Sequence, residues 1–407
     1  MNIPAKVPWA DLARADLPAM VDFCQRLIRT PSLSGQEGAI AGLVAEEMRA
    51  LGYDEVWIDA AGNVVGLVRG GRPGNAVLFN SHLDHVSPGD ESAWKYPPYA
   101  GVVTEEAIWG VGASDTKGAL AAQVYGVAAL RKAVSNFSGA IYVAGVVQEE
   151  TGGVGTRELV KSLRFDCAIL GEATDNQLMR GHRGGFKIVA RARGVAAHAS
   201  VPHLAVNPNY TLARFLSRLR EVPMATHPVF VTSTVAPTIY RTDQESSNVI
   251  PGEAWVYLDW RSVPGESFES AVERLRPLAE ASCEPGGSIS LEPIADLELT
   301  TYTGLKCSRH SVLPAYLVEE HHPVLVEARQ ALEQALGRPV EVGTWRFCTD
   351  GPHLMEAGVT TIGFAPAREG VPHTAQDHVT LARLEEAYRG NIALAARLGA
   401  ARLRTLD

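Results

Sequence analysis

Residues 140–172 read AIYVAGVVQEETGGVGTRELVKSLRFDCAILGE, and this stretch decides the fold class of the 407-residue chain. The apolar runs 140–147 and 167–170 predict two strands, and residues 153–162 between them predict a helix. Two strands joined by a helix form the repeating unit of an α/β domain with a largely parallel sheet. Glutamates follow both strands, at positions 149, 150 and 172.

The same alternation of strands and helices continues on both sides of this stretch. The apolar periodicity predicts strands at 54–58, 63–68, 76–79 and 359–365, and helices at 18–29, 38–50, 117–133, 322–336 and 380–402. These elements predict a three-layer α/β/α catalytic domain that is formed by residues 1–185 and 312–407.

The residues between these two parts have a different pattern. Their order of elements is strand, helix, strand, strand, helix, strand, at 185–194, 206–221, 229–240, 254–260, 266–282 and 288–295. This is the split β-α-β order of a ferredoxin-like α+β unit. We therefore predict an inserted lid or dimerisation domain at residues 186–311.

The composition narrows the function classes. Hydrophobic residues make up 46% and charged residues 20% of the chain, which is typical of a globular enzyme. A net charge of −9, with scattered Lys and Arg, argues against nucleic acid or an anionic membrane as partner. The five cysteines are irregularly spaced and form no Cys-x-x-Cys pair, which disfavours a disulfide framework and a thiolate zinc site. No apolar secretory signal or membrane-length segment is evident, so a cytoplasmic location is expected.

Polar residues with metal-binding side chains follow the predicted strands or open a predicted helix. In an open α/β sheet, functional side chains gather at the carboxyl ends of the strands. Two histidines and three carboxylates suit a pair of zinc ions that share a bridging ligand, and cobalt or manganese would also fit. The candidate ligands are His82, Asp115, Glu150, Glu172 and His373. The pattern predicts a metal-dependent hydrolase.

Each of these positions also has a structural interpretation. His82 and Asp84 lie on one side of an extended backbone, so Asp84 can orient the imidazole, or both can decorate a loop. Asp115 can bridge two metals or cap a helix. Glu149 and Glu150 diverge, so that one can bind metal while the other serves as general base, or both can be a solvated surface pair. His85 should point away from His82 and is expected to be structural.

Five motifs in order resemble the superfamily of co-catalytic zinc enzymes that includes aminoacylase, acetylornithine deacetylase, succinyl-diaminopimelate desuccinylase and carboxypeptidase G. The matching pieces are SHLDHV (81–86), GASDTKG (112–118), QEETGG (148–153), GEAT (171–174) and PHT (372–374). Residues 94–99, WKYPPY, also resemble a segment of that superfamily, and the resemblance runs from about residue 20 to 395.

The resemblance implies a role for each matching residue. His82 and Glu172 would hold one zinc ion, Glu150 and His373 the other, and Asp115 would bridge them, with Glu149 as general base and Asp84 orienting His82. His198, in GVAAHAS, is similar to a histidine that reaches the partner's site in a homodimer and stabilises the oxyanion. Asn248 and Arg261 are similar to residues that hold a substrate carboxylate, although Arg261 could instead form a strand-end ion pair.

Two positions depart from the superfamily's pattern. Asp377 stands where a glutamate usually follows the metal histidine, which keeps a carboxylate but changes its reach. His182 and Arg183 replace a simpler Lys-Gly or Arg-Gly sequence.

The predicted reaction is hydrolysis of an amide bond in a small carboxylate-bearing substrate. An N-acyl-amino acid is the first choice, followed by a dipeptidase or carboxypeptidase substrate, and then by hydrolytic deamination of an amino-carboxylate. A non-catalytic protein with a relict metal site is a rival interpretation, which the presence of Glu149 disfavours.

Overall fold

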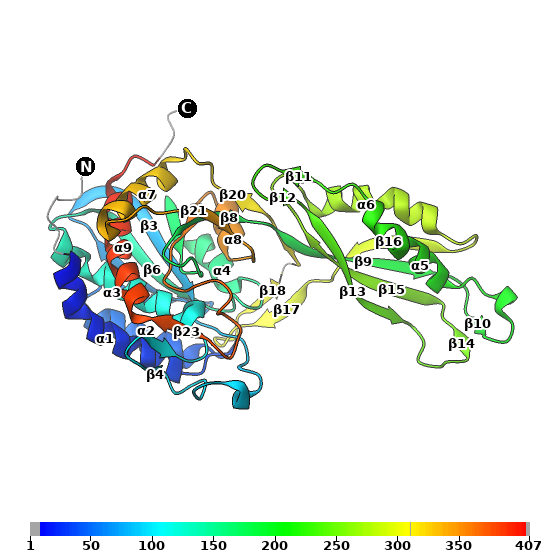
Figure 1. Ribbon diagram of the computed structural model, residues 1–407, viewed down its shortest axis with the longest axis horizontal. Coiled ribbons are helices and arrows are strands. Elements are labelled where there is room, and N and C mark those ends of the chain that lie inside the picture. Colours follow the sequence, from blue (N-terminus) through cyan, green and yellow to red (C-terminus); the bar gives the residue numbers. More distant parts are fainter. Residues whose placement is uncertain (1–8, 310, 404–407) are drawn as a thin grey trace.

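The computed structural model describes residues 9–309 and 311–403, which form two bodies joined by a narrow connection (Figure 1). The large domain contains a nine-stranded sheet, and the small domain contains a separate five-stranded antiparallel sheet. In the connection, β19 (Val312–Leu313) pairs antiparallel with the start of β9 (Gly185–Arg193).

The large sheet is parallel at its centre and mostly antiparallel toward its edges. Its strand order is β1-β2-β6-β3-β7-β22-β8-β20, with β21 beside β8. The pairs β6·β3, β3·β7, β7·β22 and β21·β8 are parallel, whereas β1·β2, β2·β6, β22·β8 and β8·β20 are antiparallel. The sheet is therefore mixed, and the predicted largely parallel sheet is correct for the three central pairs and for β21·β8. The strands are Glu55–Ile58 (β1), Val64–Arg69 (β2), Arg72–His82 (β3), Ser138–Val146 (β6), Cys167–Leu170 (β7), Leu178–His182 (β8), Tyr316–Leu317 (β20), Val342–Trp345 (β21) and Thr360–Gly363 (β22).

Helices cover both faces of this sheet, as two neighbouring residues of β3 show. Successive side chains of a strand point to opposite faces. Ser81 donates to Gln123 of α3 at 2.8 Å, and Asn80 donates to Thr156 of α4 at 2.9 Å. The expected three-layer arrangement is confirmed. The helices are Trp9–Arg29 (α1), Gly38–Ala50 (α2), Gly118–Ala133 (α3), Val154–Ser162 (α4), Pro323–Leu336 (α7), Gly351–Glu356 (α8) and Leu381–Ala400 (α9).

The small domain has the predicted ferredoxin-like topology. Its main strands are ordered β13-β15-β9-β16, all neighbours are antiparallel, and α5 and α6 pack together. Strand β15 alternates buried and half-buried residues, as expected of a strand with one face on a core. The elements not yet given bounds are Pro208–Arg218 (α5), Thr234–Thr242 (β13), Glu253–Arg261 (β15), Phe268–Ser282 (α6) and Ser288–Pro293 (β16).

The small domain has a hydrophobic core of its own, centred on fully buried Trp260. We expect Trp260→Ala to destabilise this domain by about 3–5 kcal/mol, the usual cost of removing a buried aromatic side chain. The matched control is Trp255→Ala, on the opposite face of the same strand, where the indole is half-buried and stacks with Arg191 at 4.7 Å. That control should cost about 1 kcal/mol. Urea unfolding followed by fluorescence measures both, and equal costs would contradict the assigned core.

Short elements complete the fold, and the periodicity predicted none of them except Val231–Thr232, which falls within the strand predicted at 229–240. Three two-stranded pairs lie in or beside the small domain: β10 (Ala197–His198) with β14 (Val249–Ile250), β11 (Thr226–His227) with β12 (Val231–Thr232), and β17 (Leu297–Thr300) with β18 (Lys306–Arg309). A three-stranded sheet in the large domain contains β4 (Val102–Val103), β5 (Ala107–Trp109) and β23 (His378–Thr380). Among residues 9–309 and 311–403, no helix has both the length and the hydrophobicity needed to cross a bilayer.

Candidate metal centre

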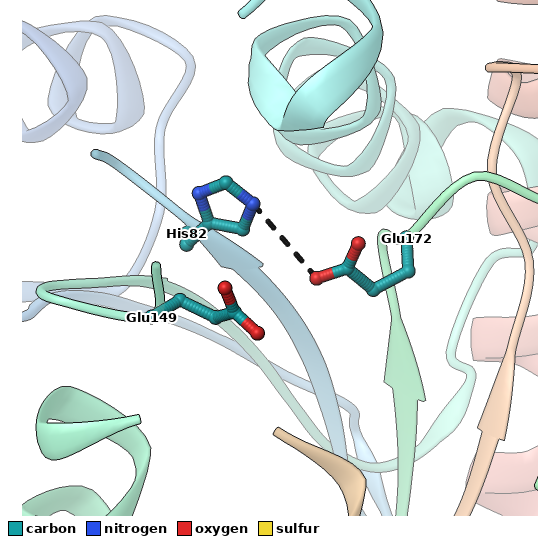
Figure 2. Close-up of side chains that lie close together, drawn as sticks. All are labelled: His82, Glu149 and Glu172. Carbon is teal, nitrogen blue, oxygen red and sulfur yellow. Dashed lines mark ion pairs between the residues drawn. The ribbon is translucent and has the colours of Figure 1, made fainter. Parts of the chain in front are cut away.

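The carboxyl ends of three neighbouring strands form the base of the candidate site. Strands β6, β3 and β7 are adjacent and parallel, so their carboxyl ends share one edge of the sheet. His82 is the last residue of β3, and Glu149 and Glu172 follow β6 and β7 after short turns. Figure 2 shows the three side chains converging from these strands.

Asp115 contacts two histidines with its two carboxylate oxygens. Oδ1 lies 2.8 Å from His82 Nε2, and Oδ2 lies 3.1 Å from His373 Nε2. Asp115 lies in the short segment Ala113–Lys117 that precedes α3, where its own backbone is not helical (φ −140°, ψ 86°), and His373 lies in the loop before β23. A carboxylate placed between two imidazoles in this way has the geometry of a bridging ligand.

The remaining carboxylates complete two groups around this bridge. Glu150 Oε1 lies 3.0 Å from His373 Nε2, and Glu172 Oε1 lies 3.8 Å from His82 Nε2. Ligand atoms of His82, Asp115 and Glu150 lie within 4.8 Å of one another, and so do those of His82, Glu149 and Glu172. The structure therefore brings all five predicted ligands together. It also places Glu149, the predicted base, at ligand distance.

The electrostatics of the cluster show an excess of negative charge. Removal from water, followed by the charges of neighbouring carboxylates, raises the pKa values of Glu149 and Glu172 well above their usual range. Burial would lower the pKa of His82, but its hydrogen bond to Asp115 and the nearby carboxylates raise it well above its usual range. Hydrogen bonds to Asp115 and Glu150 raise the pKa of His373 to about 10.

The donor set fits divalent cations. Four carboxylates and two imidazoles share a region in which the side chains of His82, Asp115, Glu150 and Glu172 are 2%, 14%, 12% and 10% exposed. A bound cation would stabilise buried charges of one sign. Imidazole nitrogens and carboxylate oxygens are ligands that suit zinc, cobalt or manganese. The site can accept two such ions, one on each side of Asp115.

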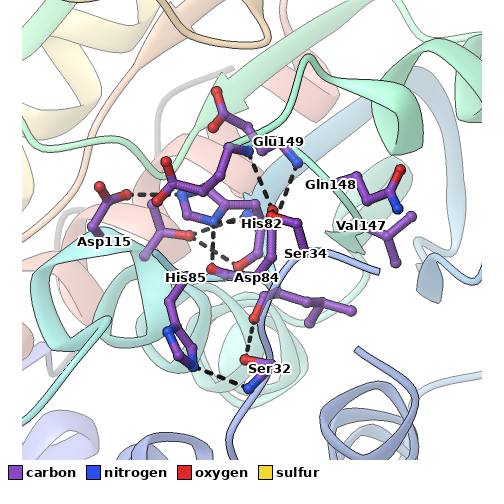
Figure 3. Close-up of polar contacts among 12 residues, drawn as sticks. Ser32, Ser34, His82, Asp84, His85, Asp115, Val147, Gln148 and Glu149 are labelled. Carbon is purple, nitrogen blue, oxygen red and sulfur yellow. Dashed lines mark hydrogen bonds and ion pairs between the residues drawn. The ribbon is translucent and has the colours of Figure 1, made fainter. Parts of the chain in front are cut away.

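Asp84 supports the turn that carries Glu149 and Glu150. Its carboxylate accepts hydrogen bonds from the backbone N–H groups of Glu149 at 3.1 Å and Glu150 at 3.2 Å, and from Ser34 Oγ at 2.7 Å (Figure 3). The atom nearest to His82 Nδ1 is the backbone carbonyl oxygen of Asp84, at 2.9 Å, whereas the carboxylate is 3.6 Å away. Asp84 is therefore placed to orient both the imidazole and the glutamate turn.

Two further residues hold the loops of the site. Asp377 accepts hydrogen bonds from the backbone of Gly112 at 2.6 Å and Ser114 at 2.8 Å, so this aspartate fixes the segment that carries Asp115. His85 points away from the cluster, as expected, and accepts a hydrogen bond from the Ser32 N–H at 3.0 Å (Figure 3).

Three predicted residues lie outside the cluster. His198 and Asn248 are exposed residues on or beside the β10·β14 pair, at the end of the small domain that is farthest from the large domain (Figure 1). His198 Nδ1 contacts Ser200 Oγ at 2.7 Å, and Asn248 Oδ1 accepts from Ser246 Oγ at 2.8 Å. Arg261 lies at the base of the small domain, where its Nε donates to Asp259 at 2.8 Å. Arg261 therefore forms the ion pair at the end of a strand that was the alternative to a role in substrate binding.

Several residues around the site were not predicted from the sequence. Asp350 is buried behind Glu149 and accepts from Thr156 Oγ1 at 2.5 Å, and burial raises its pKa to about 6. The sequence offered little indication that Asp350 belongs to the site, because the preceding strand, β21, was not predicted. Lys187, Arg309 and Cys348 line a cavity beside the centre. Lys187 carried no distinct signal, because it is one of three cations, with Arg191 and Arg193, that alternate with apolar residues in β9.

Comparisons with known proteins agree with this architecture. Residues 78–397 match the model of Peptidase family M20/M25/M40. The chain is 28% identical over 380 residues to the uncharacterized protein YgeY of Escherichia coli strain K12, covering 91% of this chain and 92% of that protein. It is 32% identical over 307 residues to the succinyl-diaminopimelate desuccinylase of Paracoccus denitrificans, covering 70% of this chain and 76% of that protein.

A solved structure has the same fold over nearly the whole length. The YXEP protein of Bacillus subtilis, described as a dinuclear metal binding peptidase from the M20 family, has a TM-score of 0.71 and 14% sequence identity. The match covers 95% of this chain and 99% of that structure.

Proposed function

Because the chain belongs to Peptidase family M20/M25/M40, whose members are metal-dependent hydrolases acting on C–N bonds, we propose that it hydrolyses the amide bond of an N-acyl-amino acid. The observation that carries the proposal is the position of Asp115 between His82 and His373, with Glu149 beside them. The match to a protein named as a desuccinylase supports a deacylase over a peptidase or a deaminase.

We assign the two cation positions to the residues on either side of Asp115. His82 and Glu172 would hold one ion and Glu150 and His373 the other, with Asp115 shared. Zinc is the preferred ion, and the dinuclear description of the Bacillus subtilis structure supports a pair. When bound, the ions supply Lewis-acid polarisation of the amide carbonyl and a water molecule of lowered pKa.

Glu149 would move the proton during hydrolysis. Its carboxylate accepts a proton from the attacking water and returns it to the leaving nitrogen, the task of a general acid–base group. The hydrogen bond from its backbone N–H to Asp84 at 3.1 Å fixes its position. Removal from water raises the pKa of Glu149 above that of an exposed glutamate.

The substrate carboxylate would be held by Arg261, whose guanidinium points into a cavity next to the centre. His198 lies on β10 and Asn248 lies directly before β14, and Figure 1 shows this strand pair at the end of the small domain that is farthest from the large domain. We propose that they serve the partner's centre in a homodimer formed through the small domain. Exposed apolar side chains in this domain, Tyr210, Ile239 and Tyr240, support such an interface.

Mixing two inactive variants tests the action of His198 across a homodimer. We expect His198→Ala and Glu149→Gln each to be poorly active alone. After dissociation and random reassociation, about a quarter of wild-type activity should return, because half of the dimers are mixed and one of their two sites is intact. Sedimentation of each sample provides the control for oligomeric state. If mixing gives only the average of the two separate activities, His198 acts in its own chain or has no role.

A substrate panel tests the proposed reaction. The protein is loaded with zinc, cobalt or manganese, and turnover of N-acetyl, N-succinyl and N-carbamoyl amino acids, dipeptides and aromatic amines is measured beside a chelated control. We expect chelator-sensitive release of a free amino acid from one acyl class. Activity on dipeptides alone would make the protein a peptidase, and ammonia release from an amine would make it a deaminase.

The domain limits 1–185, 186–311 and 312–407 are part of this proposal, with the middle segment as lid and dimerisation domain. A cytoplasmic location stays a prediction from the sequence.

A further inference from the structure

The cavity that Arg261 lines is between the two domains, beside the metal centre. Its volume is about 450 Å³. Part of its wall comes from the small domain and part from the large domain, including the turn after Glu150 and the segment before α8. The lining residues include Gly152, Lys187, Asp259, Arg261, Arg309 and Cys348.

The wall carries more positive charge than a single carboxylate requires. Lys187, Arg261 and Arg309 supply three cations, and among the described residues Asp259 is the only acidic side chain in the wall. Asp259 forms ion pairs with both Lys187 and Arg261, so two cations share one carboxylate. Burial, followed by the charges of Arg261 and Arg309, lowers the pKa of Lys187.

Arg309 connects this cavity to the reacting atoms. Its side chain lies against Gly152, where an added Cβ atom would come within 2.8 Å of Arg309 Cγ. Gly152 has a φ of 126°, and it ends the turn that carries Glu149 and Glu150. Arg309 and Cys348 also line a neighbouring hollow together with Glu149 and Glu150, and Cys348 lines the hollow over Glu172 and His373. The hollows at the metal centre and at the three cations are therefore neighbours that share lining residues.

We infer that the amino-acid half of the substrate carries a second carboxylate, as in an N-acyl-aspartate or N-acyl-glutamate. The inference rests on the proposed function, which gives the first carboxylate to Arg261. The second would lie between the Lys187 ammonium and the Arg309 guanidinium, both of which form strong charge-assisted hydrogen bonds to carboxylates. The two carboxylates of the substrate, together with Asp259, supply three negative charges, which balance the three cations. A neutral side chain would leave one cation without a partner.

The sharpest test compares substrates that differ only in this charge. N-acetyl-glutamate and N-acetyl-glutamine have almost the same shape. We expect kcat/KM of the zinc-loaded enzyme to favour N-acetyl-glutamate by about tenfold or more, the value of one charge-assisted hydrogen bond. Lys187→Met and Arg309→Met should each reduce this ratio severalfold. Lys306→Met is the matched control, because Lys306 lies on the same hairpin as Arg309 but pairs with Glu298 outside the cavity, and it should keep the ratio.

The outcomes separate this inference from the proposed reaction. Equal hydrolysis of the two substrates would overturn the inference of a second substrate carboxylate and would leave the proposed deacylase reaction unaffected. A preference for N-succinyl-glutamine over N-acetyl-glutamine that Lys187→Met abolishes would place the charge on the acyl half and overturn the assignment to the amino-acid half.

A binding measurement decides the case in which neither substrate is hydrolysed. Calorimetry on the metal-free protein compares glutamate with glutamine and needs no turnover. Tighter binding of glutamate that is lost in Lys187→Met supports the anion site even if the proposed reaction fails. Equal binding of the two amino acids overturns the site.

Discussion

Glu149→Gln is expected to lower kcat by about 10²–10⁴-fold, the contribution of a positioned general acid–base group. The amide has nearly the same shape as the carboxylate and cannot accept the proton of the attacking water. Because the proposed ligands are unchanged, the variant should retain about two metal ions per chain, measured by inductively coupled plasma mass spectrometry. KM should change less than kcat, because the lost interaction belongs to the transition state.

The metal content of this variant distinguishes a base from a ligand. Glu149 lies within ligand distance of His82 and Glu172, so geometry alone permits both roles. Loss of one metal ion in Glu149→Gln, in proportion to the loss of activity, would identify Glu149 as a ligand and contradict the proposed base. Glu298→Gln is the matched control, because this exposed glutamate pairs with Lys306 and should leave both metal content and kcat unchanged.

Asp115→Ala is expected to remove the metal pair and to lower kcat by at least about 10³-fold, because both the polarisation of the carbonyl and the water of lowered pKa are lost. Its two oxygens lie 2.8 Å from His82 and 3.1 Å from His373, so one substitution affects both cation positions. Metal content after dialysis should fall well below one ion per chain, and added zinc should not restore activity.

The control for this variant is Asp22→Ala, which removes an exposed aspartate that pairs with Arg26 on α1. Retention of one tightly bound ion by Asp115→Ala would show that Asp115 serves a single position. The shared bridge would then be excluded, whereas the other ligand assignments would remain open to test.

Strong periodicity made the central elements of the fold predictable. Strand β7 was predicted at 167–170 and α2 at 38–50, and the structure has both at those residues. A continuous apolar run or a 3.6-residue repeat is a local property, so it can be recognised without knowing the neighbours. The antiparallel edges of the large sheet were missed because pairing depends on which segments meet, and short strands such as β20 carry no periodic signal.

The centre of the site was predictable for a similar reason. His82, Glu149 and Glu172 follow apolar strands, and the strand-end rule then places them together. The cationic cavity was not predictable. The β17·β18 hairpin carries Arg309 to the cavity, and this hairpin lies in a polar stretch without periodicity. Arg309 also has room there only because Gly152 lacks a side chain. The position of His198 at the far end of the small domain depends on two-residue strands that only tertiary contacts define.

The order of the elements along the chain has a consequence for synthesis on the ribosome. Strand β22, which lies between β7 and β8, follows the whole small domain in the sequence, and so does His373. At usual translation rates, roughly 10–40 s separate the synthesis of Glu172 from that of His373. During that time the emerging chain holds an incomplete sheet, while the small domain, with its own core, can already fold. Hydrolysis can therefore begin only after residue 373 has left the ribosome and β22 has closed the gap, so the unfinished chain cannot act on its substrate.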